Sequence, residues 1–168
     1  METLCTSKLI NEYGNSLYRF CRRLTYSKED ADDLFQETFL KVLAQPHKIN
    51  ASDNPQSFLF STALYIWKSW KRKFARRNRI VPICEFDENI PMVGDVEDQL
   101  IKQEENQRVR DLVNALPDKF KIPIFLYYMS EFTVSDIAKT MNLPIGTVKS
   151  RLFKARKLIE KGLVQYEK

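Results

Sequence analysis

The chain has 168 residues, and its 27 Lys and Arg against 22 Asp and Glu give a net charge of +5 at pH 7. This length suits one large domain or two small ones, and an apolar fraction of 43% with only four glycines argues against a disordered chain. No apolar run reaches the roughly 18 residues of a membrane-spanning helix, and no apolar segment follows the N-terminus as in a signal peptide. We therefore expect a folded cytoplasmic protein without an integral membrane segment.

The sequence lacks the patterns that catalysis and metal binding require. Cys5, Cys21 and Cys84 are widely spaced without a C-x-x-C pair, which favours reduced thiols over disulfides or a zinc site. The single histidine, His47, stands beside Pro46 in an expected loop, and no nucleophile motif accompanies it. The scattered glycines form neither a P-loop nor a G-x-G-x-x-G motif. The sequence therefore predicts no enzyme, no metal site and no cofactor.

Charged residues are gathered in blocks of one sign. Residues 29–37 and 85–98 are acidic, whereas 68–79 and 149–161 are basic apart from Glu160. The second acidic block contains Pro91 and Gly94 and has no helical period, which predicts a linker. We therefore expect an all-α protein in which two small helical domains, residues 1–80 and 98–168, are joined by a flexible acidic linker at 81–97.

Two amphipathic helices are predicted in the first domain. The first contains "DADDLFQETFLKVL" and ends at Pro46. Its apolar residues are Leu34, Phe35, Leu40, Val42 and Leu43. Its acidic face would be repelled by phosphate, so Asp33, Gln36 and Glu37 suit a basic or polar protein surface, although an ordinary solvated helix shows the same pattern.

The second helix is predicted over about 57–77, with start signals at Pro55 and Ser57. Its C-terminal half contains both aromatic and cationic side chains. Its rings are Tyr65, Trp67, Trp70 and Phe74, and its cations are Lys68, Lys71, Arg72, Lys73, Arg76 and Arg77. Stacking on such rings contributes about 1–3 kcal/mol per base of single-stranded nucleic acid. Alternatively, Trp67 and Trp70, three residues apart on one side, are buried while the cations face water. Both readings remain open.

The second domain is expected to begin near Asp98 with a polar helix, followed by core residues in "LPDKFKIPIFLYYM". Thr133 and Asp136 form a T-x-x-D pattern that resembles a capping box at the start of a short helix. Residues 142–146 are expected to turn the chain, and Thr147 is expected to cap the helix that follows.

This last helix divides into an apolar and a basic side on a helical wheel. Val148, Leu152, Ala155 and Ile159 share one narrow sector, and the outer arc holds Lys149, Ser150, Phe153, Lys154, Arg156 and Lys157. A ring such as Phe153 on a solvated face loses burial unless something covers it. The pattern predicts a helix-turn-helix whose second helix enters the DNA major groove and contacts bases and phosphates. The alternative is a surface helix with solvated cations.

These pieces in this order resemble a bacterial RNA polymerase sigma factor of the extracytoplasmic-function (ECF) group of the sigma-70 family. The matching segments are "DADDLFQETFLKV", "SFLFSTALYIWKSWKRKFARR" and "FTVSDIAKTMNLPIGTVKSRLFKARKLI", so the resemblance spans nearly the whole chain. It implies a region 2 domain at 1–80, a region 4 domain at 98–168, and a protein that directs core RNA polymerase to promoters and initiates transcription.

The resemblance also implies roles for individual residues. Contact with the polymerase clamp helices falls to Asp33, Gln36, Glu37 and Phe39. Recognition and melting of the minus-ten element fall to Asn50, Ser52, Asp53, Tyr65, Lys68, Ser69 and Arg72, with the loop at 49–55 capturing a flipped base. Recognition of the minus-thirty-five element falls to Thr147, Lys149, Ser150, Phe153, Lys154 and Lys157. The polymerase flap and an anti-sigma factor are further implied partners. The chain departs from the family pattern at Phe58 and Tyr65, where Trp and Asn are common.

Two other functions compete with this interpretation. An autonomous helix-turn-helix regulator of duplex DNA would leave the acidic helix and the aromatic-basic helix without a role, and such regulators usually dimerise across two half-sites. A protein-binding adaptor built on the acidic helix would leave Phe153 and the basic arc unexplained.

Overall fold

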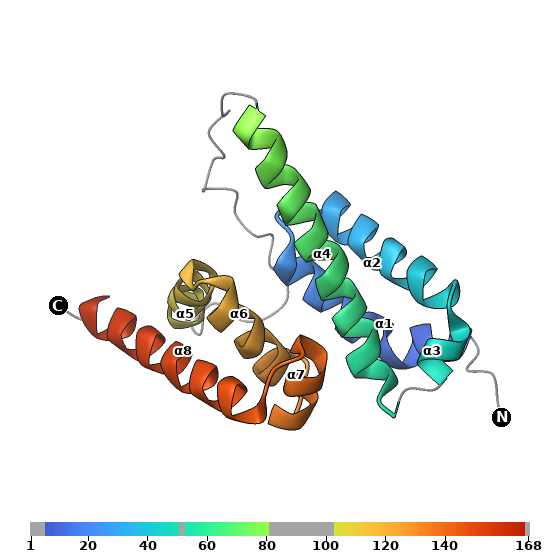
Figure 1. The fold of residues 1–168 in the computed structure, drawn as a ribbon. Helices are drawn as coiled ribbons and strands as arrows, with labels where there is room; N and C mark the ends of the chain where they lie inside the picture. Colours follow the sequence, from blue (N-terminus) through green and yellow to red (C-terminus); the bar gives the residue numbers. More distant parts are fainter. Residues whose placement is uncertain (1–5, 51–52, 81–102, 167–168) are drawn as a thin grey trace. The chain divides into compact units, whose positions relative to one another are not determined.

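The computed structural model describes residues 6–50, 53–80 and 103–166, and these contain helices and no strand (Figure 1). The chain divides into two compact units, Met1–Met92 and Val93–Lys168. The expected all-α fold with two helical domains is therefore confirmed. The linker predicted at 81–97 lies outside the described residues, as do Cys5 and Cys84.

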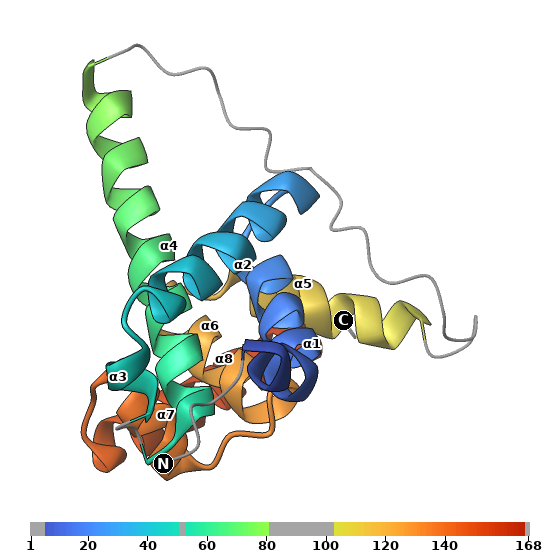
Figure 2. The same cartoon turned by 90° about the vertical axis from the view of Figure 1, so that its right-hand side faces the viewer.

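The first unit is built from α1 (Thr6–Leu24), α2 (Lys28–Leu43), α3 (Pro46–Asn50) and α4 (Pro55–Ile80). Helix α2 packs against both α1 and α4, and Figure 2 shows α2 and α4 side by side. Buried apolar side chains from the three long helices form the core, among them Leu9, Leu17, Phe20, Leu34, Leu59 and Phe60. The rings of Phe20 and Phe60, from α1 and α4, lie 5.0 Å apart between centroids. This packing fixes which faces of α2 and α4 remain exposed.

The helix starts in this unit follow local capping chemistry. The Ser27 hydroxyl accepts a hydrogen bond from the Asp30 backbone N–H at 3.0 Å and caps α2. Asn54 caps α4 in the same way, because its side-chain oxygen accepts from the Ser57 N–H at 3.0 Å. Helix α4 thus begins at Pro55, slightly earlier than predicted, and the cap is Asn54. A proline at the first helical position is favourable because its missing N–H would have no intrahelical partner.

Two expectations for the segment around α2 were wrong. Pro46 does not lead into a loop but opens the short helix α3, so His47 is helical. Leu40 and Leu43 are 69% and 37% exposed, although they were counted with the apolar side of α2. The buried stripe instead passes through Thr38, whose hydroxyl donates to the Leu34 carbonyl at 2.6 Å and so needs no other partner. The apolar side of α2 is therefore narrower than the sequence suggested.

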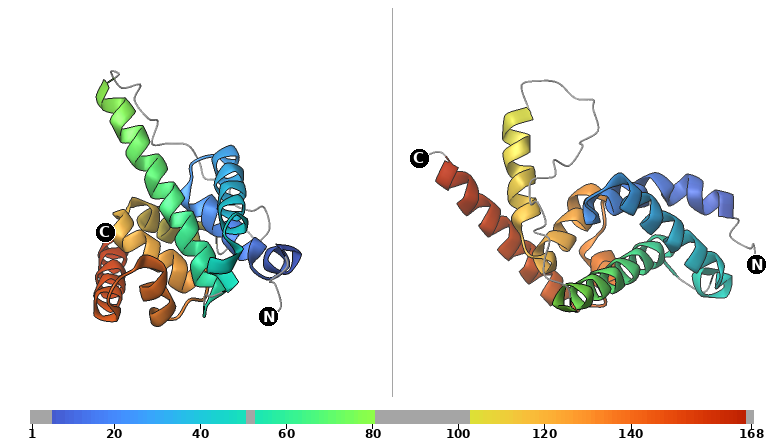
Figure 3. Two further views of the ribbon diagram at one scale, coloured as in Figure 1. Left: turned by 45° about the vertical axis from the view of Figure 1, so that its right-hand side comes forward. Right: turned by 90° about the horizontal axis from the view of Figure 1, so that it is seen from above.

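The second unit is built from α5 (Gln103–Ala115), α6 (Asp118–Ile124), the π-helical turn η1 (Phe125–Met129), α7 (Val134–Met141) and α8 (Ile145–Tyr166). Helix α8, red in Figure 3, packs against α5, α6 and α7. The core gathers Ile122, Leu126, Ile137, Val148, Leu152 and Ala155. Gly162 allows α5 to approach α8 closely, because a Cβ there would lie 2.4 Å from a terminal carbon of Leu112.

The apolar run before α7 is only partly core. Ile122, Ile124 and Phe125 are buried, as expected, but Tyr127, Tyr128 and Met129 are exposed. The chain widens here into η1, in which the Ser130 N–H reaches back five residues to the Phe125 carbonyl at 3.3 Å. Such widened turns are often found at functional sites. The predicted core segment therefore ends in a solvent-facing aromatic pair.

Candidate protein and nucleic-acid interfaces

Helix α8 has the two faces that the helical wheel predicted. Val148, Leu152 and Ala155 are buried and Ile159 is half-buried. The outer residues are all exposed: Lys149, Ser150, Phe153, Lys154, Arg156 and Lys157. Phe153 is 61% exposed, and Lys157 Nζ lies 5.6 Å from its ring centroid. A large ring is thus held in solvent among positive charges.

The capping box that starts α7 is confirmed. The Thr133 hydroxyl accepts from the Asp136 N–H at 3.1 Å, and the Asp136 carboxylate accepts from the Thr133 N–H at 3.3 Å. This reciprocal pair satisfies two backbone donors that would otherwise lack partners at the helix start. It fixes the first helix of the predicted helix-turn-helix.

The turn that follows is shorter than predicted. Helix α7 ends at Met141 and is followed by its C-cap Asn142, which adopts the left-handed conformation with φ of 53°, and α8 begins at Ile145. Asn tolerates this conformation better than most residues, so no glycine is needed. Gly146 instead lies in the first turn of α8, where a Cβ would meet no neighbour within 4 Å.

Thr147 does not cap α8, contrary to the prediction. The backbone N–H groups of Thr147 and Val148 both donate to the Pro144 carbonyl, at 3.0 and 3.2 Å. Thr147 is therefore already the third residue of the helix, half-buried beside the exposed Lys149. Its position still borders the outer arc of α8.

Helix α2 presents the acidic face expected of a protein-binding helix. Asp33, Gln36 and Glu37 are all exposed. Phe39 differs from them, because it is 6% exposed and its ring lies 4.9 Å from that of Phe35. The prediction of Phe39 as a contact residue does not fit this burial, since a buried ring supports the helix from within.

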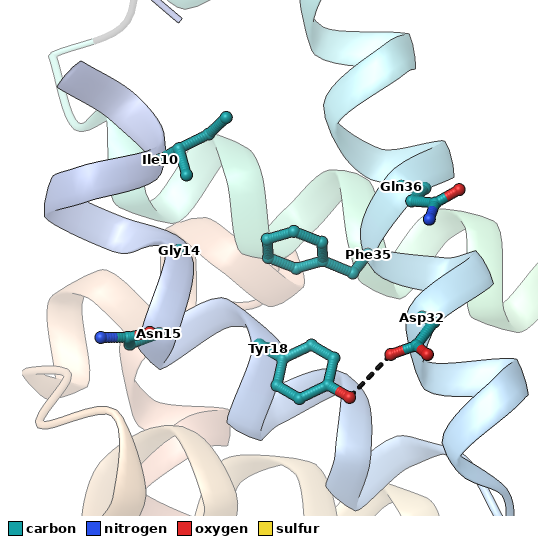
Figure 4. Close-up of a pocket in the computed structure, with 7 residues that line it drawn as sticks. All are labelled: Ile10, Gly14, Asn15, Tyr18, Asp32, Phe35 and Gln36. Carbon is teal, nitrogen blue, oxygen red and sulfur yellow. Dashed lines mark hydrogen bonds between the residues drawn. The ribbon is translucent and has the colours of Figure 1, made fainter. Parts of the chain in front are cut away.

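A groove beside this acidic face was not predicted from the sequence (Figure 4). It encloses about 320 Å³ between α1 and α2 and is lined by Ile10, Gly14, Asn15, Tyr18, Asp32, Phe35 and Gln36. The Tyr18 hydroxyl donates to the Asp32 carboxylate at 2.7 Å, which also raises the pKa of Tyr18. A Cβ at Gly14 would lie 3.4 Å from Ile10 and 3.9 Å from Phe35, which are ordinary van der Waals distances, so a small side chain there would line the groove without a clash. The spacing of Ile10, Gly14 and Tyr18 on one side of α1 was the available sequence signal.

The two tryptophans of α4 are more buried than base-stacking platforms would be. Trp67 is 8% exposed, and Lys71 Nζ lies 4.7 Å from its ring centroid. Trp70 is half-buried, and its indole nitrogen donates to the Glu37 carboxylate at 3.2 Å. The open alternative is thereby resolved for Trp67, which belongs to the core.

Other rings of α4 remain accessible. Tyr65 is 59% exposed, with Lys41 Nζ of α2 lying 4.2 Å from its ring centroid, and Phe74 is also exposed. The cations around them are exposed: Lys68, Lys71, Arg72, Lys73, Arg76 and Arg77. Helix α4 therefore combines a buried aromatic side with a cationic side that carries rings of its own.

The residues predicted for the minus-ten element are only partly brought together. Tyr65, Lys68, Ser69 and Arg72 follow one side of α4 at helical spacing; Ser69 is half-buried and the others are exposed. Asp53 is exposed just before α4, and Asn50 ends α3. Ser52 lies outside the described residues. One face of α4 thus carries four of the seven.

The remaining chemistry of the described part is structural. Cys21 is buried, and burial raises the pKa of its thiol to about 12. Within the described ranges, no three His, Cys, Asp or Glu side chains are grouped closely enough to hold a metal ion. None of the helices there is sufficiently long and apolar to span a membrane.

Comparison with protein families matches both units. The family model Sigma-70 region 2 matches residues 9–78, and the model Sigma-70, region 4 matches residues 106–159. Similar curated proteins include the ECF RNA polymerase sigma factor SigW of Bacillus subtilis, 23% identical over 92% of this chain and 87% of SigW. The ECF RNA polymerase sigma-E factor of Haemophilus influenzae is 29% identical over 90% of this chain and 84% of its own.

Solved structures share the fold. The sigma factor RpoE of Bartonella quintana, crystallised with the anti-sigma factor NepR, aligns with a TM-score of 0.80 and 24% identity over 94% of this chain and 95% of RpoE. CnrH, solved with the cytosolic domain of CnrY, aligns with a TM-score of 0.68 and 18% identity over 97% of this chain and 89% of CnrH. The two regional matches and the curated relatives identify the chain, which shares this fold, as a sigma factor of the ECF group in the sigma-70 family.

Proposed function

We propose that this sigma factor works as a non-catalytic subunit with three separate working surfaces. The acidic face of α2 binds the clamp helices of core RNA polymerase, α4 recognises and opens the minus-ten element, and α8 reads the minus-thirty-five element. In this role the chain acts in the cytoplasm, where the polymerase transcribes.

One observation carries the proposal: each unit holds an exposed aromatic ring within a field of exposed cations. Tyr65 on α4 is 59% exposed, and Phe153 on α8 is 61% exposed. Packing within the fold does not account for either ring, because both are exposed. Contact with nucleic acid would give each ring a partner. Bases stack on rings, and the methyl group of thymine packs against them, while the cations neutralise phosphate.

The polymerase-binding surface is supported by charge and by the groove next to it. Asp33, Gln36 and Glu37 give α2 an exposed acidic and polar face, which complements a basic partner and is repelled by DNA. Gln36 also lines the groove between α1 and α2. An apolar side chain of the partner can enter this groove while the carboxylates pair at its edge.

The minus-ten surface consists of Tyr65, Lys68, Ser69 and Arg72 along α4, with Asn50, Ser52 and Asp53 ahead of it. Arg72 and Lys68 hold the backbone of the opened strand, and Tyr65 offers its ring to a base. Lys41 currently lies over the Tyr65 ring at 4.2 Å, so a base stacking on that face displaces it. Lys41 then becomes available to a phosphate.

The minus-thirty-five surface consists of Lys149, Ser150, Phe153, Lys154 and Lys157, with Thr147 at its border. In helix-turn-helix proteins, the N-terminal residues of the second helix contact base edges. Lys149, Ser150 and Phe153 lie within the first nine residues of α8 and suit this role. Lys154 and Lys157 suit phosphates.

Reconstituted transcription tests the proposal. Core RNA polymerase with and without the full chain is given a pool of random-sequence templates, and the transcripts are sequenced. We expect new start sites that share two upstream elements and appear only with the chain. Identical transcripts in both reactions would contradict the proposal, and binding of duplex DNA by the chain without core would then favour an autonomous regulator.

An anti-sigma factor is a further proposed partner. This proposal is supported by RpoE, the relative of similar fold that was crystallised with one. Such a protein would cover the acidic face of α2 or the outer arc of α8 and compete with polymerase or DNA. Competition is measured by adding a candidate partner to the transcription reaction above.

A further inference from the structure

Arg156 is held in place by two tyrosines from another part of the second unit. Its Nε donates to the Tyr128 hydroxyl at 2.8 Å, and its guanidinium carbon lies 5.4 Å and 5.7 Å from the ring centroids of Tyr127 and Tyr128. The tyrosines belong to the π-helical turn η1, and Arg156 belongs to α8. Their rings meet edge to face at a centroid distance of 4.9 Å. The result is a fixed aromatic bracket around one exposed cation.

This bracket uses only part of the guanidinium. Arginine has five N–H donors in a planar fork, and the hydrogen bond to Tyr128 occupies the one on Nε. No carboxylate of the described residues pairs with Arg156, whereas the adjacent Lys157 lies 3.5 Å from Glu160. Arg156 and both tyrosines are exposed. Four donors and an uncompensated charge therefore face solvent in a set orientation.

The position of Arg156 indicates which ligand it meets. It lies seven residues after Lys149 and three after Phe153, which places all three on one side of α8. It is also the twelfth residue of α8, beyond the N-terminal residues that reach base edges in helix-turn-helix proteins. At that distance along the helix, a groove-bound α8 meets the sugar-phosphate backbone.

We propose that Arg156, bracketed by Tyr127 and Tyr128, forms a binding site for a backbone phosphate of duplex DNA at the edge of the minus-thirty-five surface. This inference rests on the proposed function, because it requires α8 to face DNA. Arg156 contacts the phosphate, and Tyr128 is a positioning residue that acts through it. Because the guanidinium is ordered before binding, less side-chain entropy is lost on contact.

Holoenzyme binding to promoter DNA at several salt concentrations tests the site. The probe is a promoter fragment enriched from random-sequence DNA by the wild-type holoenzyme. We expect Arg156→Ala to lower affinity about tenfold, since it removes a charge-assisted hydrogen bond. It also reduces the slope of log affinity against log salt by about 0.9, which corresponds to one phosphate contact.

Tyr128→Phe separates positioning from charge. This variant keeps the ring and the arginine, so the salt slope stays unchanged while affinity falls about threefold with the loss of the hydroxyl acceptor. In the Arg156→Ala background, Tyr128→Phe has no further effect. A full effect of Tyr128→Phe in that background, or an unchanged slope in Arg156→Ala, would overturn the inference.

Two controls distinguish this inference from the wider proposal. Lys119→Ala removes an exposed charge from α6 and keeps the wild-type slope. Lys154→Ala lowers affinity if α8 faces DNA at all. Loss of affinity in Lys154→Ala but not in Arg156→Ala overturns only the phosphate site, whereas no effect in either variant also contradicts the DNA-reading role of α8.

Discussion

The indole nitrogen of Trp70 on α4 donates a hydrogen bond to the carboxylate of Glu37 on α2, at 3.2 Å. The helix proposed to open the promoter is thus tied to the helix proposed to bind the polymerase. Lys41, four residues after Glu37, makes a second link through the ring of Tyr65. Both links join α2 to α4, the two helices that carry these proposed surfaces.

A double-mutant cycle should detect the first link. We expect Glu37→Ala and Trp70→Phe each to lower the free energy of unfolding by about 0.5–1 kcal/mol, with no further loss when they are combined, because both remove the same hydrogen bond. Trp67 remains as a fluorescent reporter of the first unit during urea unfolding. Asp33→Ala, an exposed carboxylate one turn earlier, is the control and should add to Trp70→Phe independently. Additive losses for Glu37 and Trp70 would contradict the link.

Phe153 and Leu152 are neighbours in sequence, but Phe153 is exposed and Leu152 is buried. Truncation to alanine should therefore affect stability little at Phe153 and strongly at Leu152. Phe153→Ala should change the free energy of unfolding by less than about 0.5 kcal/mol, because the ring is exposed. Leu152→Ala should cost about 2–5 kcal/mol, because it leaves a cavity in the core. Urea unfolding followed by circular dichroism measures both.

The same pair should separate DNA binding from folding. At a temperature where both variants are folded, Phe153→Ala should bind promoter DNA in the holoenzyme more weakly than Leu152→Ala does. A stability loss in Phe153→Ala as large as that in Leu152→Ala would mean that the ring serves the core.

Glu131 adopts a backbone conformation that suits glycine. Its φ is 55°, in the left-handed region that costs most L-residues about 1–2 kcal/mol. Glu131→Gly should therefore raise the free energy of unfolding by about 0.5–1 kcal/mol, since the relief exceeds the added freedom of the unfolded chain. Lys139→Gly, at an exposed position inside α7, is the matched control and should lower it by about 1 kcal/mol. Equal losses in the two variants would refute the prediction.

Burial of Cys21 should make its thiol inert. Its pKa is raised from 9.0 to about 12, so at pH 8 the folded protein holds far less thiolate than the unfolded chain. In a Cys5→Ser, Cys84→Ser variant, the remaining thiol should react with a disulfide reagent at least about 100-fold more slowly than in denaturant. Rapid reaction of the folded variant would contradict the burial.

The raised pKa of Cys21 also makes the stability of the protein depend on pH in a predictable direction. The folded state favours the protonated thiol of Cys21. The contribution of this thiol to the free energy of unfolding is therefore complete below pH 9 and is lost as the pH rises towards about 12. Stability should thus fall more steeply above pH 9 in the wild type than in Cys21→Ala. Unfolding in urea at pH 8 to 10.5 provides the comparison.

Hydrophobic periodicity predicted the buried and exposed faces of α8 because both faces depend only on the sequence of that helix. Val148, Leu152 and Ala155 recur at helical spacing, and any partner on that side buries them. The capping box of Thr133 and Asp136 was equally predictable from the sequence, because it depends only on two residues that are three positions apart. Features that depend on one short segment were therefore predictable.

Features that depend on two segments were not. Burial of Trp67 depends on the helices that pack against α4, and the groove at Gly14 depends on the packing of α1 on α2. The sequence of a single helix does not specify which other helix packs against it. The mistaken cap at Thr147 has a local cause, because the Pro144 carbonyl had already accepted the first helical hydrogen bonds.

The division of α8 into a buried stripe and an exposed arc also bears on how such a protein diverges. Folding of the second unit depends on the stripe of Val148, Leu152 and Ala155, whereas the exposed arc is free of that constraint. Under the role proposed for the arc, descendants of this gene can therefore exchange its residues one at a time and acquire new promoter preferences while the buried stripe keeps the unit folded.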